Sequence, residues 1–322
     1  MNFNEIQKQL FEIKSEKDFN QVALAVFEYQ YNQIDVYKSY CDLITRTPKT
    51  VVSIEDIPFL PIQFFKTFQV YNNSNTVDEI FSSSGTTGTQ TSKHFVTDIK
   101  LYEESFIKGF DFAYEDWKDC AIIGLLPSYL ERKGSSLIYM VDYLIKNSNK
   151  TTSKFQLDIT PEFTNYLEQS EEPKIMFGVT FALLDLAEKG IKPKNTTIIE
   201  TGGMKGRGKE LTRTELHELL QKKLAPKAIH SEYGMTELLS QAYLKDKTFE
   251  CPPWMKVSLR DATDPFSHYS LGKGVINVID LANLNSCSFI ATDDLGKLNS
   301  DGSFEVLGRL DYAQIRGCNL LL

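Results

Sequence analysis

The chain has 322 residues, of which 42% are hydrophobic and 24% are charged, and its formal net charge at pH 7 is −8. This length suits one large domain or two intimate ones, and the composition is ordinary for a globular protein in water. The negative charge argues against a broad nucleic-acid-binding face, which would have to be basic, but it allows a small cationic site for phosphates.

Residues 1–75 are predicted to form a helical N-terminal segment. Between Phe3 and Ile13, apolar residues recur at intervals of three and four and form one stripe. A second helical stretch is expected from about residue 18 to about residue 35. The aromatic residues within 64–68 are expected to pack against the core.

Residues 76–250 are predicted to form an α/β core, because short apolar runs of strand length alternate there with stretches of helical periodicity. Examples of these runs are residues 121–126, 174–177 and 197–199. Thr212 and Glu215 have the spacing of a capping box, which predicts the start of a helix. Strands that alternate with helices indicate a substantial sheet.

Residues 251–322 are predicted to form a small β-rich subdomain, because strand-like segments are separated there by Gly, Asn and Asp turns. The expected strands are residues 275–280, 288–292 and 303–306. The whole chain is interpreted as one α/β domain, in which mixed sheets with flanking helices are joined to this β-rich part.

The start of the chain has no basic or apolar region typical of a secretory signal, and no apolar run approaches the roughly 18 residues of a membrane span. The five cysteines are odd in number and include no CxxC pair, so neither a disulfide framework nor a zinc site is indicated. They are Cys41, Cys120, Cys251, Cys287 and Cys318. We therefore expect a cytoplasmic protein with free thiols.

A loop rich in hydroxyl groups, residues 82–92, follows the apolar pair Ile80-Phe81. Its two glycines allow backbone N–H groups to converge, and its serine and threonine hydroxyls can donate to phosphate oxygens. No Gly-Lys-Ser or Gly-Lys-Thr occurs in the chain, so this is not a Walker loop. A surface turn is the alternative interpretation, because Ser, Thr and Gly are common in loops.

A second motif, residues 231–237, follows a predicted strand. Tyr233 offers a flat face for a base, and Gly234 permits close approach of the backbone. Thr236 offers a hydroxyl for a phosphate, and Glu237 is a hard ligand suited to Mg²⁺. The alternative is a turn followed by a helix cap.

Two further motifs occur near the end of the chain. Asp293 and Asp294 could accept hydrogen bonds from ribose hydroxyls, although an acidic β-turn would give the same pattern. Arg309, after Gly308, would supply a fixed bidentate donor.

These four motifs, in this order, resemble the adenylate-forming superfamily that includes the acyl-CoA synthetases. Residues 126–136 and 200–208 are similar to segments of the LuxE-type acyl-protein synthetases and of the phenylacetate–CoA ligases. The resemblance implies the N-terminal large domain of that fold. It also implies ATP and Mg²⁺ as cofactors and a carboxylic acid that is converted to an acyl-adenylate.

The resemblance also assigns roles to individual residues. It gives phosphate binding to Lys93 and to the hydroxyl-rich loop, namely Ser83, Ser84, Gly85, Thr86, Thr87 and Gly88. It places Thr201, Gly202 and Gly203 along the adenosine and Tyr233, with Gly234, against the adenine. It gives Thr236 the α-phosphate, Glu237 the Mg²⁺, and Asp294 the ribose hydroxyls, with Arg309 nearby.

Two departures from the family pattern concern Lys93 and the end of the chain. Lys93 lies five residues beyond Gly88, farther than in many relatives, which leaves its phosphate role open. The chain ends at Leu322, where relatives continue into a mobile domain, so we expect that C-terminal domain to be absent.

Cys318, near that end, has two interpretations: an acceptor of the acyl group or a small packed residue. His230, before Tyr233, could likewise contact substrate or be a hydrogen-bonded residue at a strand end.

The sequence therefore predicts an adenylate-forming ligase of the acyl-protein synthetase (acyltransferase) type. It would activate a fatty or aryl acid and transfer the acyl group to a thiol, with an acyl-accepting reductase or carrier protein as its partner. A phenylacetate-type CoA ligase that needs a partner stays open as an alternative, although CoA itself is not indicated. So does a subunit that binds nucleotide or acyl groups without catalysis. Neither a nucleic-acid partner nor a membrane span is expected.

Overall fold

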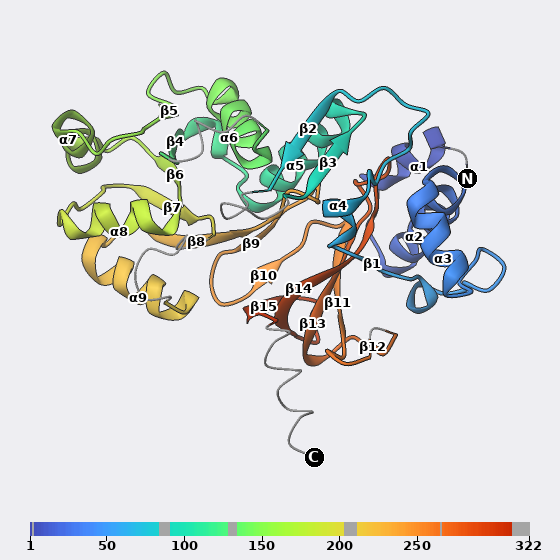
Figure 1. The fold of residues 1–322 in the computed structure, drawn as a ribbon. Coiled ribbons are helices and arrows are strands. Elements are labelled where there is room, and N and C mark those ends of the chain that lie inside the picture. The colour runs from blue at the N-terminus through green and yellow to red at the C-terminus, as the bar shows by residue number, and fades with distance from the viewer. Residues whose placement is uncertain (2, 84–90, 128–133, 203–210, 265, 311–322) are drawn as a thin grey trace, which may run out of the picture. The chain divides into compact units, whose positions relative to one another are not determined.

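The computed structural model describes residues 1, 3–83, 91–127, 134–202, 211–264 and 266–310 (Figure 1). The chain divides into two compact units. The first combines Met1–Thr76 with Pro253–Leu322, and the second is the continuous segment Val77–Pro252.

The second unit is built on a sheet with a parallel core, in the order β8-β7-β6-β4-β5, which two antiparallel strands, β9 and β10, extend beyond β8. The strands are β4 (Ala121–Leu125), β5 (Lys154–Phe155), β6 (Lys174–Gly178), β7 (Thr196–Glu200), β8 (Ala228–Tyr233), β9 (Ala242–Leu244) and β10 (Phe249–Glu250). Every residue of β4 and β6 is buried, because helices cover both faces. The predicted strands at 121–126, 174–177 and 197–199 are confirmed.

Helices lie on both sides of this sheet, and Figure 1 shows α6 on one side and α8 and α9 on the other. They are α5 (Ile99–Ala113), α6 (Ser136–Asn147), α7 (Pro161–Gln169), α8 (Thr180–Glu188) and α9 (Arg213–Leu224), with a 3₁₀ turn, η2 (Trp117–Asp119). The capping box predicted at Thr212 and Glu215 is confirmed, since Glu215 N donates to Thr212 Oγ1 over 3.2 Å. A two-stranded hairpin, β2 (Glu79–Ser82) and β3 (Lys93–Val96), precedes α5.

The first unit contains an antiparallel sheet in the order β12-β11-β13-β14-β15, with the short β1 parallel to β14. Its strands are β1 (Leu60–Pro61), β11 (Met255–Arg260), β12 (His268–Tyr269), β13 (Gly272–Asp280), β14 (Phe289–Leu298) and β15 (Phe304–Arg309). Its helices are α1 (Phe3–Leu10), α2 (Glu16–Gln33), α3 (Asp35–Leu43) and α4 (Phe64–Thr67), with the 3₁₀ turn η1 (Ile54–Asp56). The predicted helices and the predicted strands within 275–280, 288–292 and 303–306 are found, and β13 and β14 are longer than expected.

A buried amide joins the two chain segments of this unit. Gln30 Nε2 on α2 donates to Asn283 O, Leu284 O and Ser288 Oγ over 2.9, 3.0 and 3.0 Å. Gln30 Oε1 accepts a hydrogen bond from Ser288 N. Phe27 and Tyr37 pack beside it against Phe289. Buried polar groups persist in a core when they are paired in this way.

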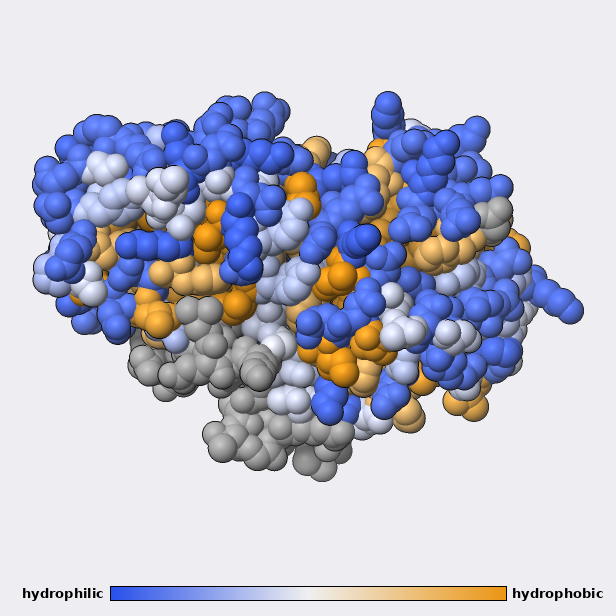
Figure 2. All heavy atoms as spheres, turned by 90° about the horizontal axis from the view of Figure 1, so that it is seen from above, coloured by the Kyte–Doolittle hydropathy of each residue, from blue (hydrophilic) through white to orange (hydrophobic). Residues whose placement is uncertain are grey.

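The face seen in Figure 2 is largely hydrophilic, with apolar residues in smaller groups. None of the helices in the described ranges is both long enough and apolar enough to cross a bilayer. Among the described residues, no group of three or more His, Cys, Asp or Glu side chains is arranged to hold a metal ion by itself.

Candidate functional site

The predicted nucleotide-binding segments follow neighbouring parallel strands. Leu125, Gly178, Glu200 and Ser231 share one register row near the carboxyl ends of β4, β6, β7 and β8. In open α/β sheets, ligands bind beyond the carboxyl ends of the strands. The segments that begin at Thr201 and after Tyr233 therefore leave the sheet at the edge where a ligand is expected.

Thr201 carries a buried hydroxyl at this edge. The residue is 3% exposed, and its backbone N–H donates to Gly178 O over 3.0 Å. No group of the described residues hydrogen-bonds to Thr201 Oγ1. Gly202 follows with φ +44°, a conformation that favours glycine, and Gly203 lies outside the described residues. A buried hydroxyl without a protein partner is suited to a polar ligand atom.

A chain of hydrogen bonds supports the ends of β7 and β8. The Glu200 carboxylate accepts from Thr180 Oγ1 over 2.8 Å and from Ser231 Oγ over 3.1 Å. His217 Nε2 lies 2.9 Å from Ser231 Oγ and thus connects the network to α9. Burial, and next the nearby Arg213, lower the pKa of His217 to about 4. The imidazole is therefore neutral at pH 7.

Tyr233 closes β8 on the same side of the sheet as this network. Its ring centre lies 5.8 Å from that of Phe249, and the Arg213 guanidinium lies 4.7 Å from the Phe249 ring centre. The tyrosine is therefore held by aromatic packing at the strand end, where a flat ligand could lie beside it.

The loop after β8 is tied to the hairpin that carries the hydroxyl-rich loop. His94 Nδ1, on β3, lies 2.8 Å from Thr236 O. Ser105 Oγ on α5 lies 2.9 Å from Ser240 Oγ, a few residues farther on. Glu237, between these ties, is buried. Two motifs separated by about 140 residues in sequence thus adjoin within one unit.

Of the hydroxyl-rich loop, the structure describes only the residues at its base, next to β2 and β3. Ser83 N donates to Ser92 O over 3.1 Å, and Ser83 Oγ accepts from Ser92 N over 2.9 Å, so Ser83 helps to close the hairpin. Lys93 is exposed and pairs in register with Ser82. The predicted phosphate ligands Ser84, Gly85, Thr86, Thr87 and Gly88 lie outside the described residues.

The two motifs near the end of the chain meet in the first unit. Asp294 on β14 and Arg309 on β15 are register partners, and Arg309 Nε lies 3.4 Å from Asp294 Oδ1. The Asp294 side chain is 15% exposed and that of Arg309 is 81% exposed. Gln63 donates to both carboxylate oxygens of Asp293, over 2.8 and 2.7 Å, so Asp293 has a structural partner. Cys318 lies outside the described residues.

His230 and Glu232 lie on the face of β8 opposite to Ser231 and Tyr233. His230 Nδ1 lies 3.0 Å from Tyr114 OH, and the two rings stack, which confirms the hydrogen-bonded alternative for His230. Burial, and next Lys245, lower the pKa of His230 to about 4. The sequence did not indicate a functional role for Glu232, because a single carboxylate within a predicted strand forms no recognisable motif.

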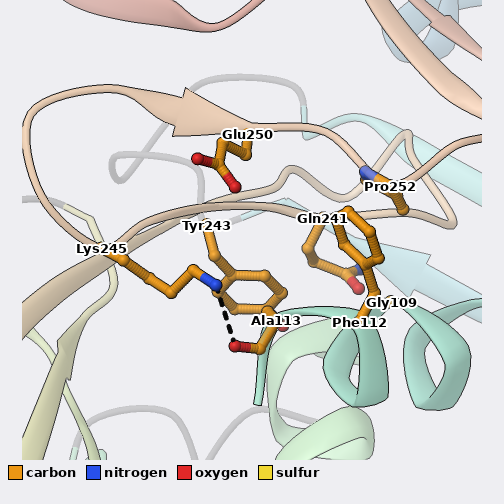
Figure 3. Close-up of a pocket in the computed structure, with 8 residues that line it drawn as sticks. All are labelled: Gly109, Phe112, Ala113, Gln241, Tyr243, Lys245, Glu250 and Pro252. Carbon is orange, nitrogen blue, oxygen red and sulfur yellow. Dashed lines mark hydrogen bonds between the residues drawn. The ribbon is translucent and has the colours of Figure 1, made fainter. Parts of the chain in front are cut away.

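A small pocket opens on this opposite face between α5 and the strands β9 and β10 (Figure 3). Lys245 Nζ donates there to Ala113 O over 3.2 Å at the end of α5. None of the predicted site residues lines this pocket. Its lining residues are Gly109, Phe112, Ala113, Gln241, Tyr243, Lys245, Glu250 and Pro252.

Comparison with known proteins gives one family match and one curated relative. Residues 7–113 match the family described as "Acyl-protein synthetase, LuxE". Over 76 residues the chain is 32% identical to a long-chain-fatty-acid–luciferin-component ligase from Photorhabdus luminescens. The aligned region covers 23% of this chain and 65% of that ligase. The motifs from Thr201 onward lie outside the family match.

Solved structures share the fold over a larger part of the chain. ATP-bound MatB from Rhodopseudomonas palustris superposes with a TM-score of 0.54 at 17% identity, over 72% of this chain and 48% of MatB. The O-succinylbenzoate coenzyme A synthetase MenE from Bacillus subtilis, in complex with ATP and magnesium, gives 0.52 at 18% identity, over 73% and 50%. At such identities the likeness establishes the fold.

This chain spans about half the length of those solved proteins and about two thirds of the curated relative. The predicted fold class, that of the N-terminal part of the adenylate-forming enzymes, is confirmed. In residues 7–113 the chain is similar to the acyl-protein synthetase LuxE family, and its fold is similar to that of MatB and MenE.

Proposed function

We propose that this protein activates a carboxylic acid with Mg·ATP and passes the acyl group to a thiol. The carboxylate oxygen bonds to the α-phosphorus as pyrophosphate leaves, and the sulfur then displaces AMP from the acyl carbon. The observation that carries this proposal lies at the carboxyl edge of the parallel strands. There Thr201, whose hydroxyl has no hydrogen-bond partner among the described residues, and Tyr233 lie at the ends of neighbouring strands, and the Thr236 loop is bonded to the hairpin that carries the hydroxyl-rich loop.

The chemistry requires charge neutralisation and alignment more than a strong base. In this scheme Tyr233 packs against the adenine, and Thr201 with Gly202 lies along the adenosine. Thr236 donates to the α-phosphate. The bond from His94 to Thr236 O fixes the backbone of that loop.

The residues present fit a magnesium nucleotide. Mg²⁺ in such sites is held by one or two carboxylates together with substrate phosphates and water, so it does not need a cluster of protein ligands. Glu237 supplies one carboxylate in the Thr236 loop, and bound Mg²⁺ would neutralise phosphate charge there. Asp294, which is paired with Arg309 in the first unit, is assigned to the ribose hydroxyls.

The names of the relatives support a fatty or aryl acid as substrate. The thiol that accepts the acyl group is assigned to Cys318 or to a carrier or reductase protein. Burial raises the pKa of Cys41 to about 12 and raises that of Cys287 further, so neither is a nucleophile at neutral pH.

Acid-dependent exchange of radiolabelled pyrophosphate into ATP tests the first step. Glu237→Gln is expected to lower the exchange at least about 100-fold, because it removes a charge from the site. Thr201→Val is expected to raise the KM for ATP about tenfold while the fold keeps its stability, since the hydroxyl lost has no hydrogen-bond partner among the described residues.

Thr97→Val is the matched control for Thr201→Val, because Thr97 Oγ1 is also a buried hydroxyl without a described partner but lies in no predicted motif. Equal KM values for ATP in both variants would contradict the site. No exchange with fatty, aryl or polyene acids would contradict the proposed function.

The acceptor is tested separately with radiolabelled acid and ATP. Label that stays on the wild-type protein but not on Cys318→Ala would identify Cys318 as the acceptor. Turnover that depends on free CoA, with no label on protein, would instead indicate a CoA ligase.

A further inference from the structure

Glu232 lies at the end of β8, next to Tyr233 but on the opposite face of the sheet. Tyr243 on β9 is its register partner, and Figure 3 shows the Tyr243 side chain between β9 and α5. His230, two residues earlier, points to the same face and contacts Tyr114 at the end of α5. Glu232 is thus a carboxyl group in an aromatic environment between the sheet and α5.

The polar groups around Glu232 are directed elsewhere. Tyr102 OH donates to Ser136 O over 3.0 Å, and Tyr114 OH is bonded to His230. Tyr243 OH is directed at the sulfur of Met140, 4.0 Å away. Within the described residues, no hydrogen bond reaches the Glu232 carboxyl. Burial, and next the negative Glu200, raise its pKa to about 8.

The carboxyl also lies against the loop of the proposed nucleotide site. A Cβ built on Gly234 would be 2.1 Å from Glu232 Oε1 and 3.2 Å from Gln241 Cγ. Glycine at position 234 therefore lets the carboxyl lie directly against the backbone of the loop. Tyr233 points to the α9 side, where adenine is assigned, and a small pocket opens on the α5 side of the sheet, to which the acid is assigned.

We infer that the acid activated here carries a hydrogen-bond donor, a hydroxyl or an amino group, and that Glu232 recognises this donor. The inference rests on the proposed function. A plain hydrocarbon chain beside Glu232 would remove water from the carboxyl without forming a hydrogen bond to it. A donor on the acid would satisfy it, and sites built to bond a substrate hydroxyl discriminate strongly against analogues that lack it.

The test compares acids of equal chain length in pyrophosphate exchange: plain fatty and aryl acids, and the same acids with a hydroxyl or amino group at successive positions. Wild type is expected to prefer one donor-bearing acid in kcat/KM at least about tenfold over its plain counterpart. Glu232→Leu, which is apolar and of similar size, is expected to abolish or reverse that preference.

Glu232→Gln distinguishes the two kinds of donor. The amide can still bond a hydroxyl but, unlike the carboxyl, cannot ionise to pair with an ammonium group. Retained preference would therefore identify a hydroxy acid, and lost preference an amino acid. Glu250→Gln, on the other side of Tyr243 and exposed to water, is the matched control and should leave the preference unchanged.

Equal or better activity with plain acids in wild type, and an unchanged ratio in Glu232→Leu, would overturn the inference while the proposed function stands. Absence of exchange with every acid would overturn the proposed function and this inference together. Urea denaturation of each variant checks that it is folded, and Glu232→Gln provides the test if Glu232→Leu is not.

Discussion

The raised pKa of Glu232 predicts how the free energy of unfolding changes with pH, and this can be measured without an activity assay. Its pKa is about 8 in the folded protein, against an ordinary value of 4.5, because burial disfavours the charged form. Between these two pH values the unfolded chain releases the proton while the folded protein retains it. The free energy of unfolding should therefore fall as pH rises from 4.5 to 8, and the neutral carboxyl is tolerated fully only below 4.5.

The size of this effect follows from the two pKa values. At about 1.4 kcal/mol per pH unit, a difference of roughly 3.5 units sets a ceiling of about 5 kcal/mol. Glu232 is only half-buried, so water screens part of the charge, and we expect about 2 kcal/mol. Glu232→Gln does not titrate and should lose none of this stability.

The assay is urea denaturation of wild type and Glu232→Gln at pH 5, 6.5 and 8. The variant should match wild type within about 0.5 kcal/mol at pH 5 and exceed it by about 2 kcal/mol at pH 8. Glu250→Gln, at an exposed position, should show no such trend. A difference between Glu232→Gln and wild type that is constant with pH would refute the argument, because it would mean that Glu232 ionises freely in the folded state.

Three further substitutions test other features. Gln30→Ala should lower the free energy of unfolding by about 3 kcal/mol, because it leaves the groups bonded to its amide unpaired, whereas an unchanged urea midpoint would contradict that bonding. Thr212→Ala should cost about 1 kcal/mol through loss of the α9 cap, and Thr212→Ser should restore it. Ser231→Ala should raise the KM for ATP about tenfold with a smaller change in kcat, because it would displace the Tyr233 ring that is assigned to the adenine. A fall in kcat alone would argue against that positioning role.

Much of the fold could be predicted because local patterns determine it. The buried strands β4 and β6 are continuous apolar runs, and the α9 cap follows from two residues three positions apart. The longer extent of β13 and β14 was missed because their outer ends include polar and glycine residues, such as Gly272 and Lys297, which form ladder pairs only in the presence of a partner strand.

The candidate site was predictable where a motif is contiguous and not where contacts join distant strands. Tyr233 and Thr236 were chosen from one short run of sequence. The link from Glu200 through Ser231 to His217 depends on the parallel register of β7 and β8, which no local pattern reveals. The same is true of His94, whose bond to Thr236 O spans 142 residues.

The first unit is assembled from the two ends of the chain, and this has a consequence for biosynthesis. The bonds of the Gln30 amide reach residues more than 250 positions later. At 5–20 residues per second, roughly 10 to 50 s pass on the ribosome before those partners are made. The continuous segment Val77–Pro252 can complete its own contacts earlier. During that interval the Gln30 amide on α2 lacks the partners that it has in the finished fold.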